Sequence, residues 1–550
     1  MIKEKIVVSK TAYSQRLKSF RTRAALILGT IMLFAAAATV TTAQTYTDLY
    51  NFDGTNGSNP PNMGTLAQGR DGNLYGTTSG GGANNYGVVF KITPSGMLKV
   101  LYNFDGAHGS GPNCALTLGT DGNFYGTTQG GGDNGYGTIF KITKSGTLTT
   151  LYSFTVGASP FAPPIQGTDG NFYGTYNTTV PGGGTYKITP SGTVTLLAPL
   201  PEESYAPLLL GTDGNFYGTT LHYYSNEGGT AFKMTPTGIV TILYSFSRYS
   251  RPGRPYGPLI QGSDGNFYGT TLSGGQKNGG VVFKLTPQGA ITVLHNFGDI
   301  PNDGINPFAG VVEATDGNFY GVAYTSGAMN GGVLFQITPA GAYSILHNFG
   351  DIGYDGVGPA PLMQHTSGKI YGLTSDGGTY NYGVVYSLDI GPRPFVKLVS
   401  TIGKVGRIVE VIGQGLKGTT AVSFNGTPAT FTIVCDTYLV TNVPSGATTG
   451  FVDVTTPGGT LQSNQRFNVT PVIQTFSPTS GPAGTAVTIT GNSLTQTTQV
   501  AFWGILSPSF TVDSDTQVTA TVPAGAKPGK IAITTAGGKT WSPVNFTVTP

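Results

Sequence analysis

The chain has 550 residues and a formal net charge of +3, with 85 glycines and 35 prolines. Turn-forming residues therefore make up about a fifth of the sequence, which weighs against long helices. Charged residues are 10% and aromatic residues 11% of the chain, a balance that excludes intrinsic disorder. Two cysteines exclude a disulfide scaffold and a cysteine-rich metal centre. The length suits three or four domains.

Residues 1–43 have the order of a secretory signal peptide, which is basic, then apolar, then rich in small residues. Seven of the 29 basic residues and one of the 26 acidic residues precede Ala24, and Ala24–Val40 is uncharged. We expect cleavage after Ala43 and export to the periplasm, the cell surface or the extracellular medium. An uncleaved membrane anchor is the alternative, because about 17–20 apolar residues can just span a bilayer.

Cleavage would leave 22 basic and 25 acidic residues, so the mature chain would be slightly acidic. A chain of this charge lacks the excess of Lys and Arg that binding to phosphate backbones requires. We therefore expect no nucleic-acid partner, and no membrane span after cleavage. The oligomeric state is left open.

Residues 44–391 contain seven copies of one unit. Its signature is Asp-Gly-Asn, then an aromatic residue or Leu, then Tyr-Gly. Six copies begin at Asp71, Asp121, Asp169, Asp213, Asp264 and Asp316, and a degenerate seventh begins at Ser367. The copies lie 44 to 52 residues apart and show no helical pattern. This period is typical of a β-propeller blade and not of a helical solenoid.

Each unit contains four strand signals, which we call A to D. In the fifth unit they are Pro258–Gln261, Asn266–Thr271, Val281–Thr286 and Ala290–Phe297. Asp-Gly-Asn joins A to B, and Thr-Pro-x-Gly joins C to D, as expected for tight hairpin turns. The sequence therefore predicts one four-stranded antiparallel sheet for each unit.

The two ends of the array indicate that it closes on itself. The last unit has no D strand after Asp389, whereas the mature chain begins with a D-like strand, Tyr46–Phe52. We predict that this first strand completes the last sheet, which gives a closed seven-bladed β-propeller without exposed sheet edges.

The units also resemble a known family. Gly269–Gly275 (GTTLSGG) and Gly280–Pro287 (GVVFKLTP) are similar to the GloVer tandem repeat of bacterial extracellular proteins. The resemblance covers about residues 44–391. It implies an extracellular repeat protein and brings no activity with it.

Two shorter domains follow, which we place at residues 392–469 and 470–550. Their motifs recur at an offset of 78 or 79 residues, as in Phe424–Gly426 and Phe502–Gly504. Short alternating strands between Gly and Pro turns predict two β-sandwiches. Phe476–Gly484 (FSPTSGPAG) resembles the opening of the IPT/TIG immunoglobulin-like family, and Val399–Gly406 is a degraded form of it. The resemblance implies spacers or binding modules.

The sequence carries no catalytic motif. It contains neither His-Glu-x-x-His nor Gly-x-Ser-x-Gly. His295 and His347 occupy a strand D position that Tyr fills in other units, so we interpret them as ring-for-ring replacements. The aspartates of the repeated turns are interpreted as structural, because an active site needs one asymmetric constellation. We predict no catalytic residue and no cofactor other than a possible Ca²⁺ ion.

Function is expected on the loops that differ between units. The A–B and C–D turns are uniform and share one face, whereas the B–C and D–A loops share the other face and vary. One variable group combines aromatic and basic residues suited to a sugar or a protein partner, namely Tyr223, Tyr224, Arg248, Tyr249, Arg251, Arg254 and Tyr256. A second group has oxygen ligands suited to Ca²⁺, namely Asp299, Asp303, Asp351 and Asp355. Ordinary solvated loops are the alternative for both groups.

Three functions fit these features. The first is an exported, non-catalytic binding or adhesion protein that recognises a glycan or an extracellular protein and uses its sandwich domains as spacers. The second is a carbohydrate-active enzyme, a polysaccharide lyase or hydrolase, with convergent acids or a Tyr, His and Arg set in a central pocket. The third is a structural protein of the cell envelope.

Overall fold

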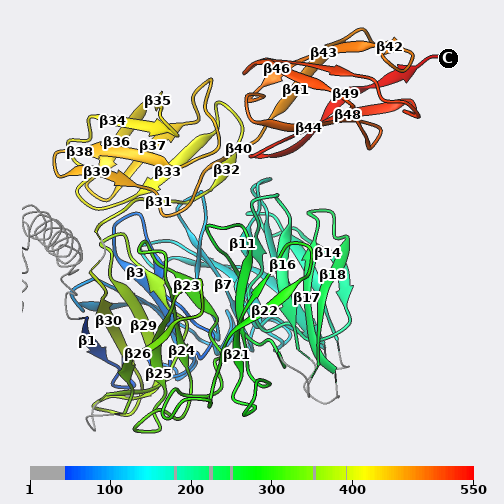
Figure 1. Cartoon of the computed structure of the whole chain (residues 1–550). Coiled ribbons are helices and arrows are strands. Elements are labelled where there is room, and N and C mark those ends of the chain that lie inside the picture. The colour runs from blue at the N-terminus through cyan, green and yellow to red at the C-terminus, as the bar shows by residue number, and fades with distance from the viewer. Residues whose placement is uncertain are drawn as a thin grey trace, which may run out of the picture. The chain divides into compact units, whose positions relative to one another are not determined.

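The computed structural model describes residues 44–155, 157–178, 182–221, 227–247, 252–350, 355–391 and 393–550 (Figure 1). These residues form β-strands joined by turns and loops. Within the described ranges, no helix is long and apolar enough to cross a lipid bilayer.

Each repeat forms one antiparallel sheet with its strands in the order A, B, C, D. In blade 5 these are β19 (Ile260–Gln261), β20 (Phe267–Thr271), β21 (Val281–Leu285) and β22 (Ile291–Asn296). The strand B side chains are buried, whereas those of strand D are only partly covered. The predicted four-stranded unit is therefore confirmed.

The other strands of the propeller are, in blade 1, β2 (Ala67–Gln68), β3 (Leu74–Thr78), β4 (Val88–Ile92) and β5 (Leu98–Asn103); in blade 2, β6 (Thr117–Leu118), β7 (Phe124–Thr128), β8 (Thr138–Ile142) and β9 (Leu148–Ser153); in blade 3, β10 (Ala158–Ser159), β11 (Ile165–Gln166), β12 (Phe172–Thr178), β13 (Gly183–Ile188) and β14 (Val194–Leu200); in blade 4, β15 (Leu209–Leu210), β16 (Phe216–Thr220), β17 (Glu227–Met234) and β18 (Val240–Ser247); in blade 6, β23 (Val311–Glu313), β24 (Phe319–Ala323), β25 (Val333–Ile337) and β26 (Tyr343–Asn348); and in blade 7, β27 (Gly356–Pro359), β28 (Met363–Gln364), β29 (Ile370–Gly377), β30 (Val384–Asp389) and β1 (Thr45–Asn51).

The first strand of the described chain closes the last sheet. β1 pairs antiparallel with β30, so that Thr45 lies opposite Asp389 and Asn51 lies opposite Val384. β30 in turn pairs with β29. The N-terminal strand is thus strand D of blade 7, as the ends of the array predicted, and it covers the edge that β30 would otherwise expose.

The hydrophobic core of the propeller lies between the blades. Seven clusters of buried residues each join two neighbouring blades. One of them packs Leu66 and Phe90 of blade 1 against Met363 and Tyr371 of blade 7. Contacts therefore run from each blade to the next and from the last blade back to the first, which closes the ring.

A pair of aromatic rings, stacked at two junctions and tilted at three, links the B strands at five of these junctions. The tyrosine of one Asp-Gly-Asn-x-Tyr unit lies over the aromatic ring at the start of strand B in the next blade. The centroid distances are 4.1 Å for Tyr75–Phe124, 3.8 Å for Tyr125–Phe172, 4.2 Å for Tyr173–Phe216, 4.2 Å for Tyr217–Phe267 and 4.1 Å for Tyr268–Phe319. Such pairs add about 0.5–1.5 kcal/mol each beyond the area they bury.

The remaining strands form two β-sandwiches with separate cores. The first packs Val411, Phe424 and Phe467, and the second packs Phe502 and Phe546. In the first the sheet orders are β31-β33-β37-β36 and β35-β34-β38-β39, with β32 parallel to β40; in the second they are β41-β43-β47-β46 and β42-β49-β48-β44-β45. Both domains thus bury the inward-facing residues of two sheets.

The strands of the first sandwich are β31 (Lys397–Leu398), β32 (Ile402–Gly403), β33 (Ile408–Ile412), β34 (Ala421–Phe424), β35 (Thr427–Ala429), β36 (Phe431–Cys435), β37 (Tyr438–Asn442), β38 (Val452–Thr456), β39 (Gly459–Gln462) and β40 (Asn468–Val469). Those of the second are β41 (Val472–Ser477), β42 (Ser480–Gly481), β43 (Ala486–Asn492), β44 (Thr497–Phe502), β45 (Ile505–Leu506), β46 (Phe510–Ser514), β47 (Gln517–Thr521), β48 (Gly529–Thr535) and β49 (Gly538–Val548).

Deleting β1 tests the closure of the ring. A chain that starts at residue 53 lacks strand D of blade 7 and leaves the edge of β30 unpaired, so we expect a lower unfolding midpoint and concentration-dependent aggregation. Thermal unfolding and light scattering measure both effects. The control is a chain that starts at residue 44, and equal stability of the two chains would contradict the closure.

Candidate functional site

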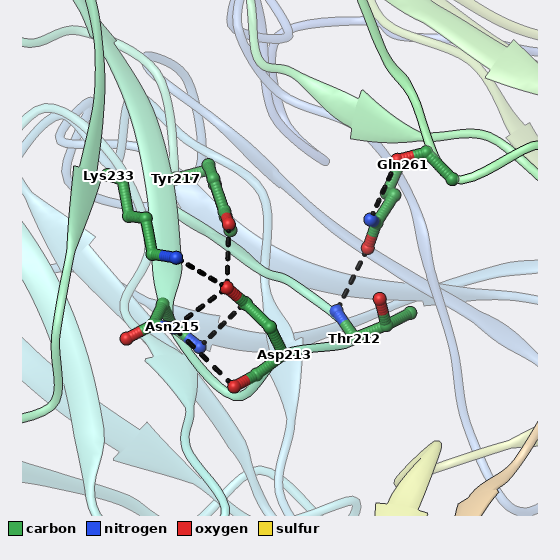
Figure 2. A network of polar contacts seen from close by, with 7 residues as sticks. Thr212, Asp213, Asn215, Tyr217, Lys233 and Gln261 are labelled. Atoms are coloured by element: carbon green, nitrogen blue, oxygen red, sulfur yellow. Dashed lines mark hydrogen bonds and ion pairs between the residues drawn. The ribbon is translucent and has the colours of Figure 1, made fainter. Parts of the chain in front are cut away.

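The Asp-Gly-Asn turn forms the same local polar network separately in each of six blades. In blade 4 the Asp213 carboxylate accepts hydrogen bonds from the Asn215 side chain (2.8 Å), the Tyr217 hydroxyl (2.9 Å) and Lys233 Nζ (2.7 Å). Figure 2 shows these three donors converging on one carboxylate. The N–H of Thr212 donates to Gln261 Oε1 of blade 5 at 2.9 Å. The turn therefore fixes its own hairpin and also contacts the next blade.

The donors keep the turn carboxylates ionised. Burial opposes ionisation of Asp264, but hydrogen bonds from Lys284, Asn266 and Tyr268 outweigh it and lower the pKa of Asp264 to about 2. The equivalent aspartates bond in the same way to the tyrosine four residues later, in the pairs Asp71–Tyr75, Asp121–Tyr125, Asp169–Tyr173, Asp213–Tyr217 and Asp316–Tyr320. These aspartates are thus structural, as the repetition indicated, and the site must be sought on the other face.

A charge-removing substitution tests the role of these turns. The pKa of Asp264 lies below the unfolded value of about 3.9, so its carboxylate stabilises the fold above that pH and the contribution is lost as the pH falls towards 2. We expect Asp264→Asn to be about 1–2 kcal/mol less stable at pH 7 and to lose less stability than the parent between pH 5 and 2.5. Urea unfolding at several pH values measures this.

The control for this substitution is Asp133→Asn, which removes an exposed carboxylate from a B–C loop. We expect little change in stability with Asp133→Asn. Equal losses from both substitutions would contradict a structural role specific to the Asp264 turn.

The structure describes part of the predicted ligand group. Tyr223, Tyr224, Arg248, Tyr249, Arg251 and, from the acidic group, Asp351 lie outside the described residues. Arg254 and Tyr256 are described and half-buried. The carbonyl of Arg254 accepts the N–H of Leu272 at 2.6 Å, which ties this D–A loop to the neighbouring B–C loop.

Tyr256 belongs to a chain of five rings that we call the aromatic arc. Its members, in order, are Phe161, Tyr205, Tyr256, Phe308 and Tyr324. Successive centroids lie 5.0, 5.1, 5.2 and 4.9 Å apart. The first four rings each come a few residues before strand A of blades 3 to 6, and the last follows strand B of blade 6. The arc therefore runs across four consecutive blades on the face of the variable loops.

The closed arrangement of the blades does not require these aromatic residues. The equivalent positions in blades 1, 2 and 7 hold Met63, Asn113 and Pro359, and the same sheets form there. The five rings are only half-buried. The arc is thus an added feature of four blades, and its rings keep part of their surface exposed.

Polar groups lie beside two rings of the arc. The Tyr205 hydroxyl donates to Glu203 Oε2 at 2.6 Å. The Tyr324 hydroxyl lies 3.4 Å from Ser375 Oγ, which donates to Asp376 Oδ2 at 2.7 Å. Carboxylates beside flat rings can accept hydrogen bonds from ligand hydroxyls, and the rings can cover an apolar ligand face.

The two histidines of strand D each pair with an aspartate. His295 Nε2 lies 3.1 Å from Asp303 Oδ2, and the imidazole stacks on Tyr343 of the next blade at 3.9 Å. Burial lowers the pKa of His295 and the Asp303 carboxylate opposes that effect. The ring-for-ring interpretation thus accounts for the edge contact with Phe297, which Tyr102 makes in the same way with Phe104, but it missed the carboxylate partner.

The second pair repeats the first one blade later. His347 Nε2 lies 2.8 Å from Asp355 Oδ2, and its ring stacks on Tyr46 of β1 at 3.7 Å. The Tyr46 hydroxyl lies within hydrogen-bond distance of both Asp355 (2.9 Å) and Asp48 (2.8 Å), which share its one proton. Burial opposes ionisation of Asp355, but the donors outweigh it and its pKa lies below the usual range. This pair therefore holds the closing strand.

The acidic loops do not converge in the part of the chain that the structure describes. Asp303 is 2% and Asp355 4% exposed, and each faces its own histidine, whereas Asp299 is exposed. Among the described residues, no group of three or more His, Cys, Asp or Glu side chains is placed to hold a metal ion. Calcium binding by Asp299, Asp303, Asp351 and Asp355 stays a prediction.

Comparison with protein families agrees with the repeats seen in the fold. The model of the Gloeobacter/Verrucomicrobia repeat matches residues 29–207 and 203–427. The chain belongs to this repeat family. The IPT/TIG domain model matches residues 471–548, which is the second sandwich. The resemblance to the tandem repeat and the IPT/TIG resemblance of residues 470–550 are thereby confirmed, whereas the IPT/TIG resemblance of residues 392–469 stays a prediction.

Solved structures similar to this member of the repeat family include virginiamycin B lyase from Staphylococcus aureus, at 16% identity and TM-score 0.43 over 63% of this chain and 98% of that one. A gluconolactonase from Xanthomonas campestris has 12% identity and TM-score 0.32 over 64% and 92%. An oligogalacturonate lyase in complex with manganese has 10% identity and TM-score 0.45 over 64% and 94%. No curated protein matches the chain.

Tyr46 of β1 offers a test of the histidine pairs in this repeat protein. Tyr46→Phe keeps the stacked ring but removes the hydroxyl that bonds to the carboxylates of Asp355 and Asp48. Because its partners are charged, we expect a loss of about 2–3 kcal/mol. Tyr343→Phe removes one bond to the Asp303 carbonyl and should cost about 1 kcal/mol. Urea unfolding at pH 7 compares them, and an equal or larger loss for Tyr343→Phe would contradict the proposed role of Tyr46.

Proposed function

We propose that this protein is an exported, non-catalytic binding protein whose variable loop face recognises a glycan through the aromatic arc. The signal-peptide pattern of residues 1–43 supports export. The two sandwiches act as spacers that display the propeller from the cell surface or in the periplasm. The aromatic arc carries the proposal.

The geometry of the arc suits a sugar ligand. Sugar rings present flat C–H faces with hydroxyl groups at their edges, and aromatic rings complement the former while carboxylates accept from the latter. The half-buried rings of Tyr205, Tyr256 and Phe308 supply successive apolar surfaces. Glu203 supplies an acceptor beside Tyr205, and Asp376 supplies one near Tyr324.

The arc is also rigid before any ligand binds. Each ring contacts the next, and the arc sits on blades that are held by the inter-blade clusters. A surface whose side chains are already ordered loses less conformational entropy on binding. This preorganisation favours recognition of a flexible polymer such as a polysaccharide.

Glycan-array binding by the chain from residue 44 to 550 tests the proposal. We expect Tyr205→Ala and Tyr256→Ala each to weaken binding about tenfold, because each removes a central surface for a sugar ring. The control is Trp541→Ala, which removes a 55% exposed ring from the second sandwich and should leave binding unchanged.

The same samples separate the alternatives. Release of oligosaccharides from a polysaccharide substrate would show a lyase or hydrolase and would overturn the non-catalytic proposal. Binding to an extracellular protein but to no glycan would assign a protein partner to the face. Binding to neither would leave a structural envelope role.

A further inference from the structure

Two exposed tyrosines on the loop face form a pair of equivalent surfaces, which we call the tyrosine platforms. Tyr382 lies in the B–C loop of blade 7 and Tyr86 in that of blade 1, and their side chains are 42% and 47% exposed. Each ring lies against a glycine in the D–A loop that leads to the next blade. A Cβ atom would lie 3.3 Å from the Tyr382 ring at Gly54 and 3.5 Å from the Tyr86 ring at Gly106.

Both loops hold their tyrosine in the same way. Asn381 and Asn85 adopt left-handed φ values of 59° and 58°. Their side-chain oxygens accept the N–H groups of Gly377 (3.1 Å) and Gly81 (3.0 Å), which closes the turn.

The backbone of each tyrosine is also bonded to the next blade. The carbonyl of Tyr382 accepts the N–H of Asn59, and that of Tyr86 accepts the N–H of Gly111, both at 2.9 Å. The two rings are therefore fixed in equivalent places, one blade apart.

The turn itself does not need a tyrosine. Blades 5 and 6 build it with Gly279 and Gly331 at this position, again after an asparagine with positive φ. In blade 5 a Cβ at Gly279 would lie 2.9 Å from the Ile305 side chain of the D–A loop. That loop thus packs against the glycine, whereas the rings of Tyr382 and Tyr86 are exposed.

The surroundings of the platforms are polar. Asp53 accepts the N–H groups of Thr55 and Asn56 at 2.9 Å, and Asp105 accepts the N–H of His108 at 2.8 Å. Each platform is therefore one ring wide, with backbone glycine beneath it and a carboxylate in the same loop as that glycine. Protein hot spots are instead ringed by further packed side chains that exclude water.

We propose that Tyr382 and Tyr86 are two equivalent subsites for a neutral polysaccharide, distinct from the aromatic arc. One sugar ring covers each tyrosine, and one chain occupies both subsites because they repeat from blade to blade. The carboxylates of Asp53 and Asp105 disfavour an acidic polymer. The ligand class rests on the proposed function, whereas the choice of Tyr382 and Tyr86 rests on the geometry of their own loops.

Affinity electrophoresis of the chain from residue 44 to 550 tests this, with soluble neutral polysaccharides (laminarin, xyloglucan and galactomannan) as probes. The variants are Tyr86→Gly and Tyr382→Gly, because glycine is the residue that blades 5 and 6 use in the same turn. We expect each variant to weaken binding about threefold to tenfold and the double variant to weaken it further, since the two subsites act on one chain.

Tyr380→Ala is the matched control, because Tyr380 is 57% exposed and lies two residues before Tyr382. It should leave the affinity unchanged, and thermal unfolding checks that all variants fold. Unchanged binding by the double glycine variant, or parent binding only to acidic polysaccharides, would overturn the inference.

The arc variants Tyr205→Ala and Tyr256→Ala distinguish this inference from the proposed function. If they abolish binding while the double glycine variant does not, the platforms are rejected and the arc stands. If only the glycine variants weaken binding, the platforms stand and the arc is rejected. A parent chain that binds no polysaccharide rejects both.

Discussion

The tyrosine that follows each Asp-Gly-Asn turn is the element on which the propeller depends. Its hydroxyl donates to the aspartate of its own turn, and at five junctions its ring lies against an aromatic ring of the next blade. One side chain thus fixes both the hairpin within a blade and the contact between blades. Because the face of the tight turns bears these constraints, the loops on the opposite face can differ between blades.

That division explains how the loop face acquires recognition surfaces. The aromatic arc occupies blades 3 to 6, and the tyrosine platforms occupy blades 7 and 1. At the arc positions the blades outside the arc hold other residues, and at the platform position blades 5 and 6 hold glycine, in each case without loss of the sheet. The repeats therefore build a constant scaffold, and residue changes in the loops of some blades create the recognition surfaces.

Much of the fold could be predicted from the sequence, because its signals are local and recur. The Asp-Gly-Asn and Thr-Pro-x-Gly turns indicated the hairpins, and the D-like strand before the first unit indicated its pairing with β30. The aromatic arc was only partly predicted, through Tyr256. The four rings of the D–A loops are 44 to 52 residues apart in the chain, and their contacts depend on how the blades pack. One signal was present, since Phe161, Tyr205 and Phe308 each precede a small residue in the same place of their repeats.

The histidine pairs show a similar limit. The spacing of eight residues from His295 to Asp303 and from His347 to Asp355 is visible in the sequence. The acids were nevertheless interpreted as possible metal ligands, because the partner of a carboxylate in a long loop depends on where the loop turns back. In this case both loops return to their own strand D and bury the acid against the imidazole.

The pairing of β1 with β30 also has a consequence for the order in which the molecule can assemble. The N–H of Thr379 donates to the side chain of Asn51, at a separation of 328 residues. The first strand is therefore synthesised long before its neighbours exist. Contacts of such separation in sequence are slow to form. Blades 1 to 6 can fold as they are synthesised, whereas the propeller closes only when blade 7 is complete. A prematurely terminated chain would leave the first and last blades without a neighbour and expose their apolar surfaces.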